Sequence, residues 1–151
     1  VRISGSDTCE LIAFTIGEQE FCVEVMAVRE IRGWTPATPL PHSPDYVCGM
    51  INLRGVVLPV MDMSLRLGMA ATVPSPRHVI IVIHVAGQLI GLLVDAVSDI
   101  VTVSSSEIQP APDVSKEMDR DFILGIIPIE GRMVCLIQLN ALFGAIESEA
   151  A

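Results

Sequence analysis

Residues 49–63, with the sequence GMINLRGVVLPVMDM, constrain the fold of this chain more than any other stretch. Two apolar runs, 50–53 and 56–60, are separated only by Arg54-Gly55. A polar residue followed by glycine between two such runs is typical of a tight β-hairpin, because glycine adopts the positive φ that the turn requires. We therefore predict a short hairpin over 50–60 in which Arg54 is the only charged side chain.

A second hairpin of the same form is predicted near the end of the chain, where runs 122–129 and 132–139 flank Glu130-Gly131. At an offset of 76 (131 minus 55), Ile51, Gly55 and Val60 correspond to Ile127, Gly131 and Leu136. At an offset of 69 (97 minus 28), five residues recur as identical types: Gln19, Val25, Ala27, Val28 and Ile31 correspond to Gln88, Val94, Ala96, Val97 and Ile100. Two such series in the same order predict an internal duplication.

The duplication also bears on Arg54, whose counterpart is Glu130. A lone cation at a turn is ordinarily a solvated side chain without a role. Because the two copies differ in charge at this position, Arg54 becomes a candidate for a specific surface function.

The predicted element order is hairpin, loop, hairpin and short helix, followed by the same series again. The predicted strands cover 11–16, 21–28, 50–53, 56–60, 79–85, 89–94, 97–101, 122–129 and 132–139. Short helical segments are expected at 62–68, at the Ser104/Glu107 capping box, and after Asn140 as an N-cap. This pattern predicts an all-β protein of two similar small barrels packed together with a groove between them.

Composition excludes several classes of function. The formal charge is −9, and Lys116 and eight arginines are the only Lys and Arg residues, which argues against nucleic-acid binding. The longest apolar run, 79–86, is far shorter than the roughly 20 residues that span a bilayer, so direct membrane insertion is not expected. The N-terminal stretch has no apolar core and does not resemble a secretory signal.

Four cysteines, Cys9, Cys22, Cys48 and Cys135, are far apart and form no C-x-x-C pair. Zinc sites usually contain such pairs, so we expect reduced thiols in a cytoplasmic protein.

No motif for catalysis or cofactor binding is present, which predicts no catalytic residues, no cofactor and no metal. His78 and His84 are six residues apart and share a strand face, but without a third ligand a buried or edge histidine is the better interpretation. Asp62 and Asp95 each follow a predicted strand, where carboxylates usually cap backbone N–H groups. The alternative of a small-molecule-binding barrel or hydrolase using His78, His84 or Asp95 would require an enclosed polar pocket.

Several motifs together resemble CheW-like adaptor domains. The string N-L-R-G-x-x-x-P-V-x-D occupies 52–62, within a matching stretch that begins at Tyr46. Residues 25–31 and 91–100, Gln109-Pro-Ala-Pro, and the hairpin that contains Leu124-Gly125 fit the same family. The resemblance covers roughly residues 10–145.

The resemblance implies two SH3-like five-stranded barrels. It also implies a cytoplasmic adaptor, recruited to membrane-associated receptor arrays, that couples the cytoplasmic tip of methyl-accepting chemoreceptors to the regulatory domain of the histidine kinase CheA. Glu30 and Arg54 match the family's receptor-binding positions, with Val28 beside them, and Val97 and Ile100 match its contact region in the second half of the domain.

From the duplication and the resemblance together, we expect a first barrel half at roughly 10–72 and a second at roughly 77–145, with exchange of terminal strands left open. Residues 1–9 and 146–151 are expected to be flexible termini. Because the chain ends about where the domain ends, a free-standing adaptor is favoured over a module of a larger kinase or a receiver-fused adaptor.

Overall fold

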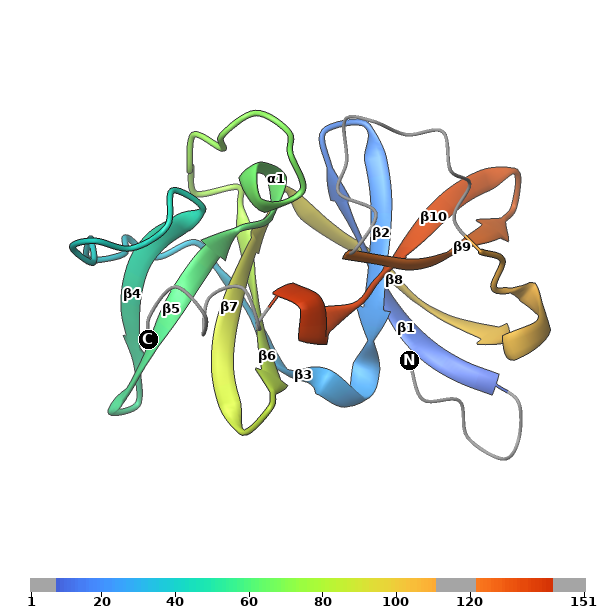
Figure 1. Cartoon of the computed structure of the whole chain (residues 1–151), viewed down its shortest axis with the longest axis horizontal. Helices are drawn as coiled ribbons and strands as arrows, with labels where there is room; N and C mark the ends of the chain where they lie inside the picture. The colour runs from blue at the N-terminus through green and yellow to red at the C-terminus, as the bar shows by residue number, and fades with distance from the viewer. Residues whose placement is uncertain (1–7, 111–121, 143–151) are drawn as a thin grey trace.

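A computed structural model describes residues 8–110 and 122–142. In this part of the chain ten strands form two five-stranded sheets that lie side by side (Figure 1). Sheet A has the order β8-β1-β2-β10-β9, and sheet B has the order β3-β6-β7-β5-β4. The all-β fold class is therefore confirmed. The strand bounds are β1 (Thr8–Ile16), β2 (Gln19–Glu24), β3 (Val28–Gly33), β4 (Val47–Leu53), β5 (Val56–Asp62), β6 (Val79–Val85), β7 (Gln88–Val94), β8 (Ala96–Ser104), β9 (Ile123–Ile129) and β10 (Arg132–Ile137).

The two sheets have the same strand order once five is added to or subtracted from each strand number. The pairing also follows the sequence offsets, since Val60 pairs with Gly91 in sheet B and Leu136 pairs with Cys22 in sheet A. Residues related by an offset of 69 or 76 are called positional twins below. The duplication seen in the sequence thus has a structural counterpart in the strand order and the register.

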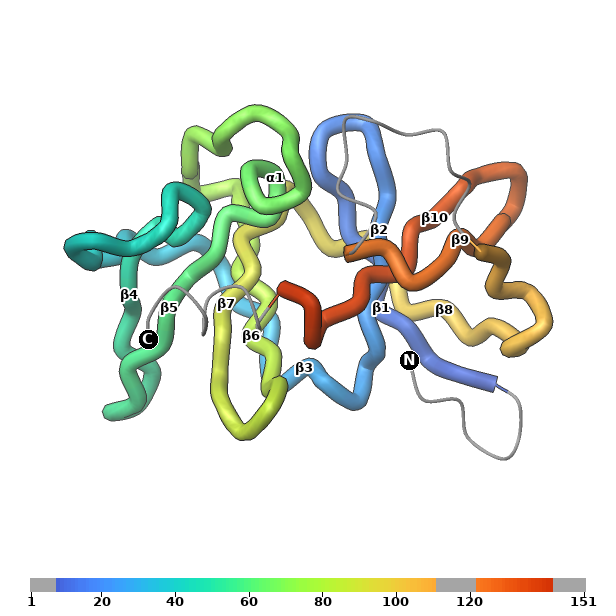
Figure 2. The backbone as a smooth tube through the Cα atoms, viewed as in Figure 1, coloured from blue at the N-terminus to red at the C-terminus, as the bar shows by residue number. Residues whose placement is uncertain are grey.

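Neither sheet is built from one contiguous half of the chain. The chain passes from sheet A to sheet B between β2 and β3, through the 3-10 turn η1 (Val25–Ala27), and returns between β7 and β8 at Asp95 (Figures 1 and 2). Hairpin β1–β2 therefore joins β8, β9 and β10, while hairpin β6–β7 joins β3, β4 and β5. The expected halves, 10–72 and 77–145, describe the repeat in sequence but not the sheets, because each half gives one hairpin to the other sheet.

The central hairpin forms as predicted. β4 and β5 pair as antiparallel strands around Arg54 and Gly55, whose φ angles are 51° and 89°. Their positional twins Glu130 and Gly131 have φ angles of 49° and 80°. Positive φ at both central residues is characteristic of the type I′ turn, which matches the twist of the flanking strands.

Three apolar clusters stabilise the fold. The largest lies between the sheets and includes Phe14, Phe21, Ile81, Ile83 and Leu92. The inner face of sheet B encloses a second cluster and the inner face of sheet A a third. Strands β1, β2, β6 and β7 are buried on both faces, which explains their nearly continuous apolar sequences.

Each sheet curls. The segment that follows one edge strand, β3 or β8, therefore reaches the opposite edge of the same sheet. Thr38 forms an isolated bridge to β4, and Gln109 forms one to β9. A Cβ atom on Gly49 would lie 2.4 Å from the Thr38 carbonyl oxygen, and one on its positional twin Gly125 would lie 2.8 Å from the Gln109 carbonyl oxygen. Both close approaches therefore require glycine.

Other local predictions differ in outcome. The helix α1 (Met63–Arg66) is N-capped by Asp62, and the Ser104/Glu107 capping box forms at η2 (Ser105–Glu107), so both predictions are confirmed. The predicted strand 21–28 is too long, because the chain turns at η1 to change sheets. Asn140 is not a cap, since residues 139–142 are already helical. Of the termini expected to be flexible, 1–9 lies mostly and 146–151 wholly outside the described residues.

Candidate docking site

Arg54 and Glu30, two of the predicted site residues, form an ion pair between the β4–β5 turn and β3. They are 24 positions apart in the chain. Two local features bring them together: the type I′ turn projects Arg54, and a register shift between Val28 and Glu30 alters how β3 faces its neighbour β6. We call Glu30 and Arg54 the rim pair.

The two members of the rim pair differ in exposure. The Arg54 side chain is 74% exposed, whereas that of Glu30 is 27% exposed. Glu30 also faces a second cation, because its Oε2 atom lies 3.6 Å from Nη1 of Arg32 on the same strand. The carboxylate thus lies between two guanidinium groups, one exposed at a turn and one half-buried on a strand.

The rim pair borders an open groove of about 890 Å³ on sheet B. Leu53, Val82 and Leu89 contribute apolar side chains that continue into the sheet B cluster. Val56 and Val57, which follow the turn, are 48% and 56% exposed and extend this apolar surface outward. The groove thus combines apolar side chains with the charged rim pair, and Arg29 is a further cation in its lining; we call it the sheet B groove.

The remaining predicted site residues are not part of this groove. Val28 and Val97 are half-buried and pack against the cluster between the sheets. Ile100 is 59% exposed on β8, an edge strand of sheet A, and its positional twin Ile31 is 44% exposed on β3. The structure therefore brings Glu30 and Arg54 together and places Val97 and Ile100 in the other sheet.

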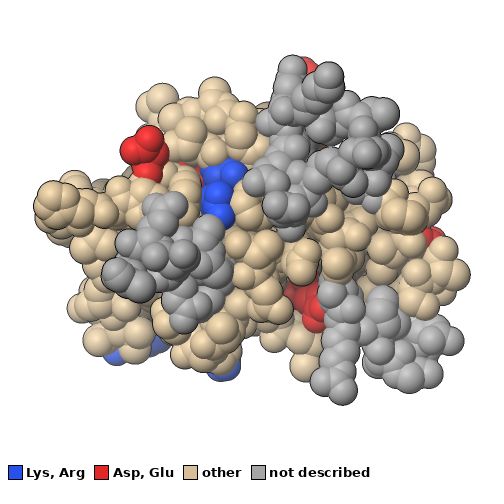
Figure 3. Space-filling model, in the orientation of Figure 1, with Lys and Arg blue, Asp and Glu red and all other residues tan. Residues whose placement is uncertain are grey.

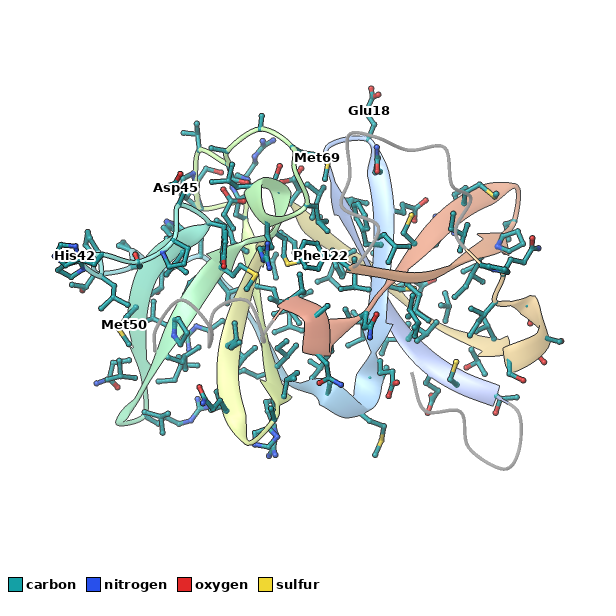
Figure 4. The ribbon with its side chains drawn as sticks, viewed as in Figure 1. Glu18, His42, Asp45, Met50, Met69 and Phe122 are labelled. Atoms are coloured by element: carbon teal, nitrogen blue, oxygen red, sulfur yellow. The ribbon has the colours of Figure 1, made fainter. Side chains whose placement is uncertain are left out.

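Sheet A carries a smaller depression, of about 380 Å³, at the position that corresponds to the sheet B groove. Arg132 and Met133 line it where sheet B has Val56 and Val57, and Glu20 lines it where sheet B has Leu89. Glu18, which also lines the depression, points outward from the β1–β2 turn (Figure 4). An ion pair of 2.7 Å between Arg132 and Glu20 fills the place of apolar contacts, so the two depressions have different chemistry.

The space between the sheets holds less of a groove than the sequence predicts. Most of it is filled by the largest apolar cluster, in whose middle Phe122 lies (Figure 4). A depression of about 280 Å³ remains, lined by residues of both sheets that include Glu24, Ala27, His84 and Gln138. The larger surface feature belongs to sheet B alone.

The residues of the hydrolase alternative do not form one enclosed pocket. The Nε2 atom of His78 lies 3.5 Å from Oδ1 of Asp95, while His84 lines the sheet B groove instead. The other carboxylate oxygen of Asp95 accepts a hydrogen bond from the backbone N–H of Gly17 at 2.7 Å. Asp62 accepts from the N–H groups of Ser64 and Thr72, so the capping roles predicted for both aspartates are confirmed.

The four cysteines are free thiols. Burial raises the pKa of Cys22 to about 12 and that of Cys48 to about 11, and it also raises the pKa of Cys9 and Cys135. A thiol with a raised pKa stays protonated near neutral pH and is a poor nucleophile or metal ligand. Within residues 8–110 and 122–142, no group of three or more His, Cys, Asp or Glu side chains is arranged to hold a metal ion.

Charged side chains are sparse on the face seen in Figure 3, where uncharged residues form most of the coloured surface. In the part of the chain that the structure describes, no helix has both the length and the apolar character needed to cross a membrane.

Sequence reasoning missed Arg32 and the exposed valines of the groove. The signal for Arg32 was present, because alternate residues of a strand share a face and Arg32 is two positions after Glu30. The signal for Val56 and Val57 was the position of two apolar residues directly after a solvent-exposed turn.

Comparisons with known proteins agree with the motifs. The family model for the CheW-like domain matches residues 10–147. A protein named chemotaxis protein CheW from Rhizobium meliloti (strain 1021) is 62% identical over 142 residues, which cover 94% of this chain and 92% of that protein. One of the same name from Bacillus subtilis (strain 168) is 35% identical, over 94% of this chain and 91% of that protein. The crystal structure of scaffolding protein TtCheW from Thermoanaerobacter tengcongensis superposes with a TM-score of 0.82 at 31% identity, over 89% of this chain and 87% of that chain.

Proposed function

This chain belongs to the CheW-like domain family, and on that premise we propose that it is a chemotaxis adaptor that couples the cytoplasmic tips of methyl-accepting chemoreceptors to the regulatory domain of the histidine kinase CheA. The names of its relatives support a role in chemotaxis, and the solved structure is named as a scaffolding protein. The function is protein binding and not catalysis.

The sheet B groove is the proposed receptor site, and the rim pair at its edge is the observation that carries this assignment. The groove offers exposed Val56 and Val57 together with the apolar side chains of Leu53 and Leu89. An amphipathic receptor helix fits such a surface, because one apolar face of the helix can enter the groove while its polar residues meet the rim. Affinity then comes mainly from apolar contact, and register and orientation come from charge.

The rim pair is suited to recognition more than to stability. Exposed ion pairs contribute roughly 0–1 kcal/mol to folding, and the Arg54 side chain is largely in solvent. A partner that approaches the groove therefore meets a cation whose release from Glu30 costs little.

The other predicted contact residues have supporting roles in this proposal. Ile100 is an exposed apolar contact on the edge of sheet A. Val28 and Val97 act from beneath the surface, because both pack against the core between the sheets and fix the strands that carry Glu30 and Ile100.

Charge reversal at the two twin turns tests the receptor site. Arg54→Glu should weaken binding to an immobilised receptor-tip fragment about tenfold or more, because it replaces the rim cation with a like charge beside Glu30. Glu130→Arg is the matched control, since it reverses the charge at the same turn position in sheet A, and binding should stay within about twofold. Circular dichroism and thermal melting establish that both variants fold. Unchanged binding by folded Arg54→Glu would contradict the assignment.

A double reversal separates recognition from internal geometry. The variant with Glu30→Arg and Arg54→Glu can form the rim pair again with its polarity inverted. If the partner reads the charges directly, the double variant stays as weak as Arg54→Glu. Recovery of wild-type binding would instead mean that the pair only shapes the turn.

A further inference from the structure

Glu30 is shared between two arginines that differ in their freedom to move. Its Oε1 atom pairs with Arg54, which extends from the β4–β5 turn with 74% of its side chain exposed. Its Oε2 atom lies 3.6 Å from Nη1 of Arg32, whose side chain is only 32% exposed and which lies on the same strand as Glu30. The two cations therefore approach the carboxylate from different elements.

Arg32 is the more firmly placed of the two. Its Nε atom is buried, with no hydrogen-bond partner among the described residues, so the guanidinium group is already partly removed from water. A charge in that position is stabilised chiefly by the nearby carboxylate of Glu30. Arg54 has no such constraint, because solvent can replace Glu30 as its partner.

Arg32 keeps the charge of Glu30 compensated when Arg54 moves away from it. Glu30 is 27% exposed, and a partly buried carboxylate without a nearby cation is costly. With Arg32 beside it, Glu30 remains compensated after Arg54 has moved away. Without Arg32, Arg54 is the only cation among the ion-pair partners described for Glu30, and its release becomes harder.

We propose that Arg32 is a positioning residue that holds Glu30 and so frees Arg54 to pair with a carboxylate of the docked receptor helix. The inference rests on the proposed receptor site and adds the chemistry of its contact, an acidic side chain opposite the rim. Arg32 does not touch the partner in this account; it acts through Glu30.

The corresponding positions in sheet A lack this arrangement. The positional twin of Arg32 is Val101, at an offset of 69, and the twin of Arg54 is Glu130. With valine and glutamate at these two positions, the described part of sheet A offers no exchange between two arginines, so this charge recognition is specific to the sheet B groove.

A double-mutant cycle tests the proposal, with affinity for the receptor-tip fragment as the readout. Arg32→Met keeps an apolar stem of similar length and should weaken binding about three- to tenfold. In a Glu30→Gln background, Arg54 is no longer held by a carboxylate, so the same Arg32→Met change should have no further effect. Arg132→Met is the matched control, because it removes an arginine paired with Glu20 in sheet A, and it should leave affinity within about twofold.

An equal loss of affinity from Arg32→Met in both backgrounds would overturn the proposal, because it would show that Arg32 acts through packing. So would full affinity in the single variant. If Arg32→Met does not fold, Arg32→Gln carries the same cycle with the same expected loss, because glutamine is polar but lacks the cation.

The proposed function and the inference fail in distinguishable ways. If the wild-type chain does not bind the fragment, both are wrong. If the wild-type chain binds and Arg54→Glu does not, but Arg32→Met binds as tightly as wild type, only the role of Arg32 is wrong.

Discussion

Arg54 of the rim pair and Asp62 both come from the N-L-R-G-x-x-x-P-V-x-D string, but their surroundings differ. Asp62 is buried, and its two carboxylate oxygens accept hydrogen bonds from the α1 N-terminus and from both the N–H and hydroxyl of Thr72. Losing a buried carboxylate with that many donors leaves them unsatisfied, which typically costs about 1–3 kcal/mol. At the scale of residues, the end of the motif stabilises the fold, while its turn carries Arg54, the residue proposed to bind the receptor.

The buried thiols make the free energy of unfolding depend on pH, and their raised pKa determines the direction of this dependence. Cys22 has a pKa of about 12, above the ordinary value of 9.0, because burial disfavours the thiolate. Below pH 9 the thiol is neutral in both the folded and the unfolded chain, so its ionisation takes nothing from the free energy of unfolding. Above pH 9 the unfolded chain ionises first, and stability falls until the pH reaches the folded pKa.

The free energy of unfolding should therefore lose about 1 kcal/mol per pH unit above pH 9 from Cys22. Urea titrations from pH 7 to pH 10.5 on wild type and Cys22→Ala measure this, and the variant should lose stability less steeply. Parallel curves for the two proteins would contradict a buried, protonated thiol at position 22.

At the scale of elements, two sets of contacts connect segments that are far apart in the sequence. One is the return of the chain at Thr38 and Gln109, which closes each sheet over a glycine. The other is Arg66 of α1, whose guanidinium carbon lies 4.3 Å from the ring centroid of Tyr46 and 4.1 Å from that of Phe122. The two rings are positional twins, so one cation links corresponding points of the repeat across the molecule.

Alanine at the closing glycines should destabilise the fold. Gly49→Ala and Gly125→Ala each place a Cβ atom against a backbone carbonyl, which cannot move as a side chain can, and each should lower the free energy of unfolding by about 1–3 kcal/mol. Gly33→Ala is the matched control, since a Cβ atom there meets nothing within 4 Å. Chemical denaturation measures all three, and equal midpoints for Gly49→Ala and Gly33→Ala would refute the closure.

At the scale of the whole molecule, the exchange of hairpins makes each half dependent on the other. Residues 8–72 supply two hairpins and β3, but β3 is separated from β4 and β5 by β6 and β7. The second half is arranged in the same way, with β8 separated from β9 and β10 by the β1–β2 hairpin. An isolated two-stranded hairpin is marginally stable at best in water.

Fragments 1–72 and 73–151 should accordingly be unfolded alone and should form strands when mixed. Far-ultraviolet circular dichroism of each fragment and of the equimolar mixture gives the test. Cooperative thermal unfolding of either isolated fragment would show that its strands do not depend on the exchanged hairpin.

The sequence predicted those features that depend on neighbouring residues. Turn chemistry located the hairpins, and N-cap chemistry located α1 and η2. The exchange was left open, because β-branched strands carry no local signal for which of two similar sheets they will join. The break at η1 was missed for a related reason, since Val25 and Ala27 continue the apolar pattern of β2 through the crossing point.

For the candidate site too, the sequence identified individual residues but not the contacts between them. Arg54 and Glu30 were identified from motif positions, but their contact depends on a type I′ turn and a shifted strand register that only the folded chain displays. Arg32 was missed because its proposed role depends on its contact with Glu30. The partner-binding roles of all five residues stay predictions: Val28, Glu30, Arg54, Val97 and Ile100.

Simultaneous binding of two partners tests the adaptor account most directly. Analytical ultracentrifugation of this chain with a CheA regulatory-domain fragment and a receptor-tip fragment should yield a complex that contains all three, and the two fragments should not associate without the chain. Arg54→Glu should release the receptor fragment and retain the kinase fragment. If either partner displaces the other from the wild-type chain, this protein does not couple them.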